Sequence, residues 1–219
     1  MESPSLLTAI EAHLEGELGD RETARELAGV LYEDVLSWRA PETDPGQIDT
    51  IMAFTFGNRM LPNGNRAPGP VNEALADVAI RLHRLKGARI YAQWEVAEAI
   101  GSRVAQEKLT PIYPGRDERA EPVYLSTGGV VSAVMAMQAD RRALGTVGVV
   151  GFSDHLWRCV ATVRQFGVDA FAPAAFAMPG EYDPQSGQPW CRSRLAYLLH
   201  DIMIRASERR GRLMGQSKC

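Results

Sequence analysis

The segment best equipped for chemistry is residues 151–158, which read Gly-Phe-Ser-Asp-His-Leu-Trp-Arg. Ser153 or Asp154 is suited to cap a helix, which leaves His155 in its first turn and Arg158 on the same face. A helix N-terminus, an imidazole and a guanidinium then converge on one point, an arrangement suited to a phosphate or carboxylate. The alternative is structural: Asp154 only caps, His155 bonds locally and Arg158 is solvated.

Two further turns carry polar groups that could take part in chemistry. Residues 126–129, Ser-Thr-Gly-Gly, could present hydroxyls and backbone N–H groups to an anion, or could form an ordinary helix cap. Glu95 could act as a general base or bind a ligand hydroxyl or amine, or could simply favour the first turn of a helix.

The candidate catalytic residues are therefore His155 and Glu95. The candidate ligand-binding residues are Gly57, Asn58, Gln93, Ser126, Thr127, Gly128, Ser153, Asp154 and Arg158.

Motifs of several other chemistries are missing from the sequence. Residues 126–129 match neither Gly-x-Gly-x-x-Gly nor the nucleotide-binding loop that ends in Gly-Lys-Ser/Thr. No His-Glu-x-x-His, Gly-x-Ser-x-Gly or Cys-x-x-Cys pattern occurs, which argues against a zinc hydrolase, a serine hydrolase or a redox enzyme. Since Cys159, Cys191 and Cys219 are widely separated, we expect no disulfide framework and no bound metal.

The elements that position these residues are predicted from the apolar pattern. From residue 48 onward, short apolar runs alternate with helical patterns, and the polar turns follow the runs. Such alternation implies a parallel sheet with right-handed crossovers and with both faces covered. We therefore expect a Rossmann-like α/β fold of about five parallel strands, with ligands bound beyond the carboxyl ends of the strands. The predicted strands are 50–56, 88–92, 122–125, 146–152 and 169–172.

The first 46 residues follow a different pattern. Apolar residues at helical spacing predict one helix over 5–18 and a second from 20 to about 38, separated by Gly19. A connector rich in proline, glycine and aspartate follows. Because neither helix is long enough to be stable alone, we expect a helical hairpin (1–46) packed on a main domain (47–219).

Composition excludes several classes of partner. The chain of 219 residues is 45% hydrophobic and 23% charged, which is typical of a globular protein. A net charge of −3 without a basic patch argues against nucleic acid. No apolar stretch approaches the roughly 20 residues of a membrane span, and the first residues lack a signal-peptide pattern. We expect a cytoplasmic protein with a small-molecule ligand and no membrane partner, and these features are compatible with a homo-oligomer.

The polar turns, in this order, resemble the YdcF/SanA/ElyC family over about residues 48–172. The features that carry the resemblance are Gly57 and Asn58 after one strand, Glu95 after the next, a Ser-Thr turn, and then segment 151–158. The His-x-x-Arg spacing of His155 and Arg158 is the most specific of them. The resemblance implies a Rossmann-like fold, and its soluble YdcF-like branch implies S-adenosylmethionine as a cofactor.

The sequence also departs from the family pattern. Where the family has three glycines after the first strand, this chain has Gly57-Asn58-Arg59, and the family's Ser-Gly-Gly before the glutamate reads Ala92-Gln93-Trp94. The asparagine that the family has after the Ser-Thr turn is not evident. These differences concern the turns that would touch the ligand, so a different ligand is open.

Three functional hypotheses follow from the sequence. The leading one is a small-molecule enzyme that binds a nucleotide-like or anionic metabolite and uses S-adenosylmethionine or phosphoryl-group chemistry. The second is a non-catalytic ligand-binding or regulatory protein with the same pocket. The third is an interaction module that uses the N-terminal hairpin.

Overall fold

The computed structural model describes residues 5–115 and 125–215. The chain forms two compact units: residues 39–198 make the main unit, and the chain up to residue 38 groups with the chain from residue 199 to 218. This division differs from the expected boundary at residue 46, because α7 (Arg194–Leu213) begins in the main unit and continues into the other.

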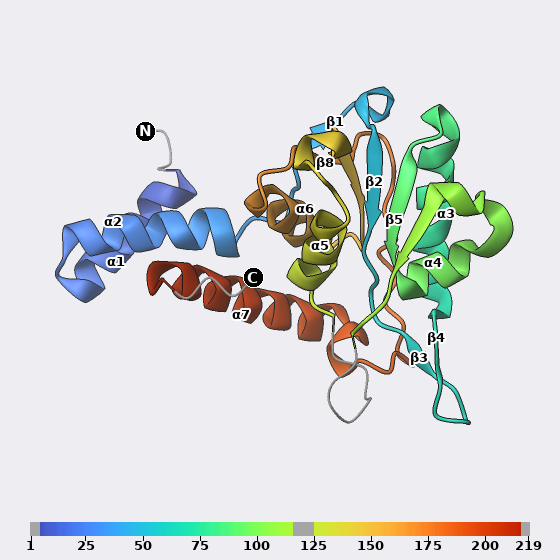
Figure 1. The fold of residues 1–219 in the computed structure, drawn as a ribbon. Coiled ribbons are helices and arrows are strands. Elements are labelled where there is room, and N and C mark those ends of the chain that lie inside the picture. Colours follow the sequence, from blue (N-terminus) through green and yellow to red (C-terminus); the bar gives the residue numbers. More distant parts are fainter. Residues whose placement is uncertain (1–4, 116–124, 216–219) are drawn as a thin grey trace. The chain divides into compact units, whose positions relative to one another are not determined.

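The main unit is built on one parallel sheet of six strands in the order β1-β8-β7-β2-β5-β6 (Figure 1). The predicted Rossmann-like α/β class is confirmed. From β2 the chain continues outward through β5 and β6, whereas β7 and β8 lie on the other side of β2. The order of strands therefore reverses at β2, which is where such sheets bind ligands. The strands are β1 Glu42–Thr43, β2 Thr50–Ala53, β5 Arg89–Gln93, β6 Leu109–Ile112, β7 Val147–Val150 and β8 Ala170–Pro173.

The strands agree with the prediction at four places and differ at two. The strands predicted over 50–56, 88–92, 146–152 and 169–172 are present with slightly different ends. Residues 109–112 were expected in a charged loop but form β6, an edge strand. An edge position tolerates Pro111, which has no N–H to donate to a neighbouring strand. Of the strand predicted at 122–125, residues 122–124 lie outside the described part of the chain.

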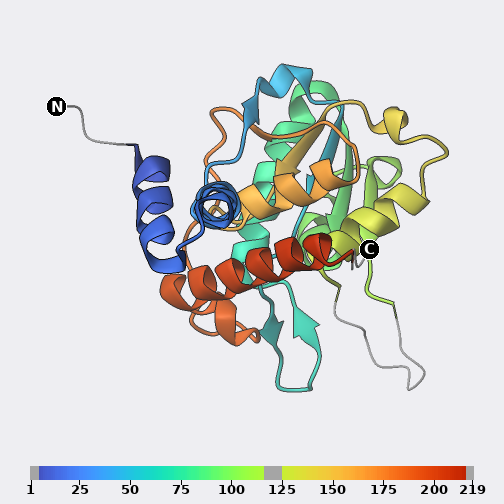
Figure 2. The same cartoon turned by 90° about the vertical axis from the view of Figure 1, so that its left-hand side faces the viewer.

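Helices cover both faces of the sheet because successive strand residues point to opposite sides. On β2, Ile51 and Ala53 join the core beneath α3 and α4, whereas Met52 and Phe54 join the core beneath α5 and α6. Figure 2 views the sheet from the face that carries α5 and α6. These four helices are α3 Gly69–Lys86, α4 Trp94–Ile100, α5 Thr127–Ala136 and α6 Leu156–Gln165.

Short elements connect the strands and helices. A small antiparallel hairpin, β3 Arg59–Met60 with β4 Arg66–Ala67, follows β2. Single 3₁₀ turns occur at Pro45–Gln47, Gly101–Arg103, Gln106–Lys108, Arg141–Leu144 and Pro189–Cys191.

The other unit contains the predicted pair of N-terminal helices. Helix α1 (Leu6–Leu18) ends at Gly19, whose φ of 64° lies in the left-handed region that favours glycine. The carboxylate of Asp20 caps α2 (Arg21–Val30), and a π-helical turn, Leu31–Val35, extends it. Among the residues that the structure describes, no helix is both long and apolar enough to cross a membrane.

Candidate functional site

Polar side chains gather in the loops at the carboxyl ends of β2, β5 and β7. Burial of so many polar groups at one sheet edge is unusual, since such residues mostly lie at the surface. Each needs a partner in the protein or a ligand to offset the loss of water. Six of the candidates from the sequence are buried there: Asn58, Gln93, Glu95, Asp154, His155 and Arg158.

Asn72 fixes the loop that follows β2. It is fully buried on α3, and its Oδ1 accepts from the Phe56 N–H at 2.9 Å and the Thr55 hydroxyl at 2.6 Å. Its Nδ2 donates to the carbonyls of Gly57 at 2.8 Å and Pro68 at 2.6 Å. Sequence reasoning missed Asn72, although an asparagine inside the apolar stripe of a predicted helix was a usable signal.

Gly57 is required by its conformation and by its surroundings. Its φ of 70° is left-handed, and a Cβ placed on it would lie 2.4 Å from the Ser186 Oγ and 3.3 Å from the Cys191 Cβ. These two neighbours belong to the irregular chain between β8 and α7, residues 174–193, which we call the covering segment. A larger residue at position 57 would push this segment away from the loop.

Glu95 lies directly after β5, in the first turn of α4, and is 3% exposed. Its Oε1 accepts from the Asn58 amide at 3.4 Å. Its Oε2 is buried and has no hydrogen-bond partner among residues 5–115 and 125–215. Burial raises the pKa of Glu95 from 4.5 to about 7, against the lowering effect of its hydrogen bonds. The carboxyl group is therefore close to half protonated at neutral pH.

Gln93 joins the loops of two neighbouring strands. Its Oε1 accepts from the Thr55 N–H at 3.2 Å, and its Nε2 donates to the Leu125 carbonyl at 3.5 Å. Both ends of the amide thus bind backbone groups. This contact set assigns Gln93 to holding the loops, and it does so beside Glu95.

Arg158 is buried among hydroxyl groups. Its Nη1 donates to the Thr127 hydroxyl at 3.1 Å and its Nη2 to the Tyr197 hydroxyl at 3.4 Å. The His155 ring lies edge-on to the same tyrosine, with 6.0 Å between ring centroids. His155 and Arg158 therefore meet at Tyr197, together with the first residue of α5.

The expected cap of α6 is not formed. His155 occupies the N-cap position, and no side chain caps this helix. Asp154 instead accepts from the Tyr182 hydroxyl at 2.9 Å and from the Arg194 guanidinium at 2.9 and 3.1 Å. Burial, followed by the hydrogen bond to Asp154, raises the pKa of Tyr182 well above its usual value, so the hydroxyl stays protonated and donates. Asp154 therefore anchors the covering segment and the start of α7.

The remaining candidates have local contacts. Ser126 caps α5, and its Oγ accepts from the Gly129 N–H at 3.1 Å, so the capping interpretation of this turn is confirmed. The Ser153 N–H donates to the Pro179 carbonyl of the covering segment at 2.8 Å. A Cβ on Gly128 would meet only the Ser126 Oγ, at 4.0 Å, so the backbone of this turn is open to close approach.

Aromatic rings close the site from the side of the covering segment. Phe56 and Phe152 stack with 3.9 Å between centroids, and the rings of Tyr182 and Tyr197 meet Phe56 edge-on. Such packing excludes water, which strengthens the electrostatic effects of the charged groups nearby. Tyr182 and Tyr197 were missed in the sequence because the segments that carry them have no strand pattern to place them at this edge.

Cys191 is a buried thiol of the covering segment, beside Gly57. Burial raises the pKa of Cys191 to about 12, against the lowering effect of the Arg158 charge. A thiol with such a pKa is protonated at neutral pH and is a poor nucleophile. Cys191 therefore fills space at the site and does not supply a reactive thiolate.

The site offers a buried protonatable carboxyl and a buried cation at one sheet edge. Within the described ranges, no three His, Cys, Asp or Glu side chains are placed to hold a metal ion. Comparison of the chain with protein-family models, with curated proteins and with solved structures finds no match. The chemistry of the site has to be argued from its own residues.

Asp154→Ala is expected to lower the free energy of unfolding by about 1–3 kcal/mol, because the half-buried Tyr182 hydroxyl loses its acceptor. Urea unfolding of the two proteins gives this difference. Asp169→Ala, at an exposed position of the same unit, is the control and should change the free energy by less than about 0.5 kcal/mol. Equal effects of the two substitutions would show that Asp154 does not anchor the covering segment.

Proposed function

We propose that this site belongs to an enzyme that binds a small anionic metabolite through Arg158 and transfers a proton through Glu95. The observation that carries the proposal is the buried Glu95 carboxyl, whose Oε2 has no partner in the described part of the chain. An unsatisfied buried carboxyl costs stability, and groups of this kind concentrate at functional sites. Its position at the strand reversal supports a ligand-facing role.

The raised pKa suits Glu95 to general acid–base chemistry. A group with a pKa near the working pH is present in both protonation states, so it can accept a proton in one step and return it in another. At a pKa of about 7, Glu95 meets this condition at neutral pH. The Asn58 amide, which donates to its Oε1, orients the carboxyl group.

Arg158 supplies the positive charge for the anionic part of the ligand. Its guanidinium is 8% exposed and is oriented by hydroxyls from α5 and from the start of α7. A charge-assisted contact in such a dry site is stronger than one at the surface. His155, beside the same tyrosine, is proposed as a second proton donor or as a further contact for the anion.

The resemblance to the YdcF-like branch favours S-adenosylmethionine as the ligand, with a phosphorylated metabolite as the other version. The donor set fits the polar groups of S-adenosylmethionine: Arg158 for its carboxylate, and Glu95 with Asn58 for its hydroxyl or ammonium groups. When bound, this cofactor would supply a methyl group.

The test begins with native mass spectrometry of the purified protein, to detect a co-purifying anionic metabolite. Calorimetric titration with S-adenosylmethionine and with adenosine monophosphate then identifies the better ligand. Arg158→Ala is expected to weaken its binding by about 10- to 100-fold, since a charge-assisted hydrogen bond is lost. Arg142→Ala, at an exposed position of the same unit, is the control and should bind as the wild type does.

Turnover separates an enzyme from a binding protein with the same pocket. Glu95→Gln is expected to bind the ligand normally and to lower turnover by about 100-fold or more, because the amide cannot transfer the proton. If the wild type binds the ligand and no turnover is detected with any acceptor, the non-catalytic alternative is favoured. If Arg158→Ala binds as tightly as the wild type, the proposed site is wrong.

A further inference from the structure

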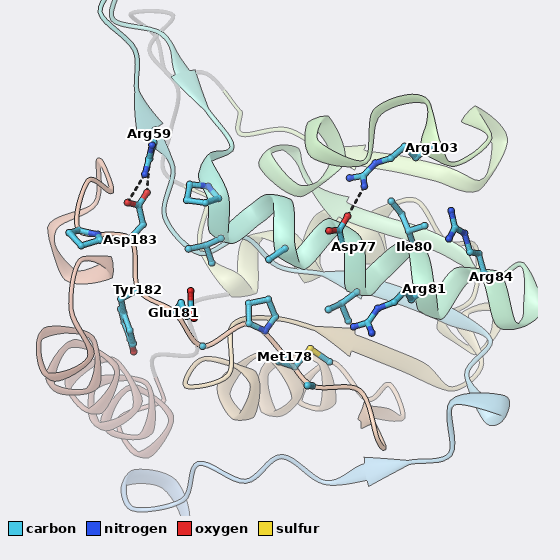
Figure 3. A pocket seen from close by; sticks show the side chains of 18 residues that line it. Arg59, Asp77, Ile80, Arg81, Arg84, Arg103, Met178, Glu181, Tyr182 and Asp183 are labelled. Carbon is cyan, nitrogen blue, oxygen red and sulfur yellow. Dashed lines mark hydrogen bonds and ion pairs between the residues drawn. The ribbon is translucent and has the colours of Figure 1, made fainter.

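A groove of about 930 Å³ runs along α3 on the outer side of the main unit. One wall is the face of α3 between Pro70 and Arg84, and the other is residues 177–184 of the covering segment (Figure 3). Fourteen helical residues at 1.5 Å each make this wall about 20 Å long. The groove is within the size range of ligand sites, and Glu95, His155 and Arg158 are not among the residues that line it.

The two ends of the groove carry opposite charges. Arg81 and Arg84 lie toward one end, and neither forms an ion pair with any residue that the structure describes; the Arg81 guanidinium rests 5.5 Å from the centre of the Phe176 ring. Glu181 lies toward the other end, and it too has no ion pair within the described chain. A ligand with a negative and a positive end would complement both.

The other charges of the groove are already paired. Arg103 donates to Asp77 at 2.6 Å, and Arg59 donates to Asp183 at 2.8 and 3.0 Å. Because these four side chains neutralise one another, they add little net charge to the groove. The attraction for a charged ligand therefore comes from Arg81, Arg84 and Glu181.

The wall formed by the covering segment offers backbone groups for pairing. Of residues 177–181, only Pro179 forms a backbone hydrogen bond with the described chain, through its carbonyl and Ser153. The backbone N–H and C=O groups of its neighbours have no such bond. Unpaired backbone groups beside an apolar surface are what an extended peptide uses when it binds alongside a protein segment. Val71, Ala74, Val78 and Met178 supply the apolar surface.

We propose that this groove binds an extended peptide of about six residues with free termini. At about 3.3 Å per residue, six residues span the 20 Å between the charged ends. The peptide carboxylate lies at Arg81 and Arg84, its ammonium group lies at Glu181, and apolar side chains contact the α3 wall. This proposal does not depend on the chemistry of the Glu95 site.

The test uses a synthetic pool of hexapeptides that carry valine, leucine, alanine or serine at the four central positions. The pool is prepared with free termini, with an amidated carboxyl end and with an acetylated amino end. The full-length protein is incubated with each pool, and the retained peptides are counted by mass spectrometry. We expect the free pool to be retained at least fivefold more than the amidated pool, and the acetylated pool to fall between them.

Variants identify the residues that read each end. In Arg81→Gln/Arg84→Gln, the preference for the free carboxylate should disappear, whereas Glu181→Gln should remove only the preference for the free amine. Arg89→Gln/Arg142→Gln is the matched control, because it removes two exposed arginines away from the groove and should keep both preferences. The melting temperature of each variant is measured, since Arg84 lies in the last turn of α3. No retention of any pool, equal retention of all three, or preferences that persist in the groove variants would overturn the proposal.

Discussion

Replacing Glu95 with glutamine is expected to stabilise the protein at pH 8 by up to about 3 kcal/mol and to leave its stability at pH 4 nearly unchanged. Burial raises the pKa of Glu95 from 4.5 to about 7. Below pH 4.5 the carboxyl is protonated in both the folded and the unfolded state, so it has no effect. As the pH rises above 4.5, the unfolded state ionises first and is favoured, and the loss of stability is complete above pH 7.

Glutamine has the shape of the protonated acid and cannot ionise, so the variant escapes this loss. Urea unfolding at pH 4, 6 and 8 measures the difference for the wild type and Glu95→Gln. The control is Glu107→Gln at an exposed position, which should follow the wild type at each pH. If the curves for Glu95→Gln and the wild type stay parallel from pH 4 to pH 8, Glu95 ionises as easily in the fold as in water.

Asn72→Ala is expected to lower the free energy of unfolding by at least about 3 kcal/mol. The substitution removes four hydrogen bonds and leaves the Phe56 N–H and the Gly57 carbonyl without their partner in a buried loop. Asn72→Asp should cost less, because it keeps the acceptor for Phe56 and Thr55 and loses only the donor. Denaturant unfolding of both variants separates the two halves of the amide.

Asn63→Ala, in the exposed turn between β3 and β4, provides the comparison and should cost less than about 1 kcal/mol. A loss at Asn72 no larger than the loss at Asn63 would mean that the loop after β2 is held by other contacts. Because that loop presents Asn58 to Glu95, Asn72→Ala should also weaken ligand binding in the protein that remains folded.

The part of the structure that could be predicted from sequence is the part set by strand and helix periodicity. The buried strands are near-continuous apolar runs, and the polar turns that follow them meet at one sheet edge. Asn58 contacts Glu95, and Thr127 contacts Arg158, although 37 and 31 residues separate the partners. The rule for ligand sites in parallel sheets was enough to group these turns.

The contacts made by irregular chain could not be predicted. Asp154 has the sequence context of a helix cap, but its partners, Tyr182 and Arg194, lie 28 and 40 residues away in segments without periodicity. Likewise, the apolar spacing of α7 predicts a helix and does not reveal that the helix begins in one unit and continues into the other. Local pattern specifies elements, whereas such long-range contacts depend on the folded chain.

The proposed proton transfer is tested most directly by an NMR titration of the glutamate side-chain carbons in ¹³C-labelled protein. One glutamate signal is expected to titrate near pH 7 in the wild type and to be missing from Glu95→Gln. A further shift of that signal when the ligand is added would connect the same carboxyl group to binding. If every glutamate titrates below about pH 5.5, in the range of solvated carboxyl groups, Glu95 is not the proton-transfer group.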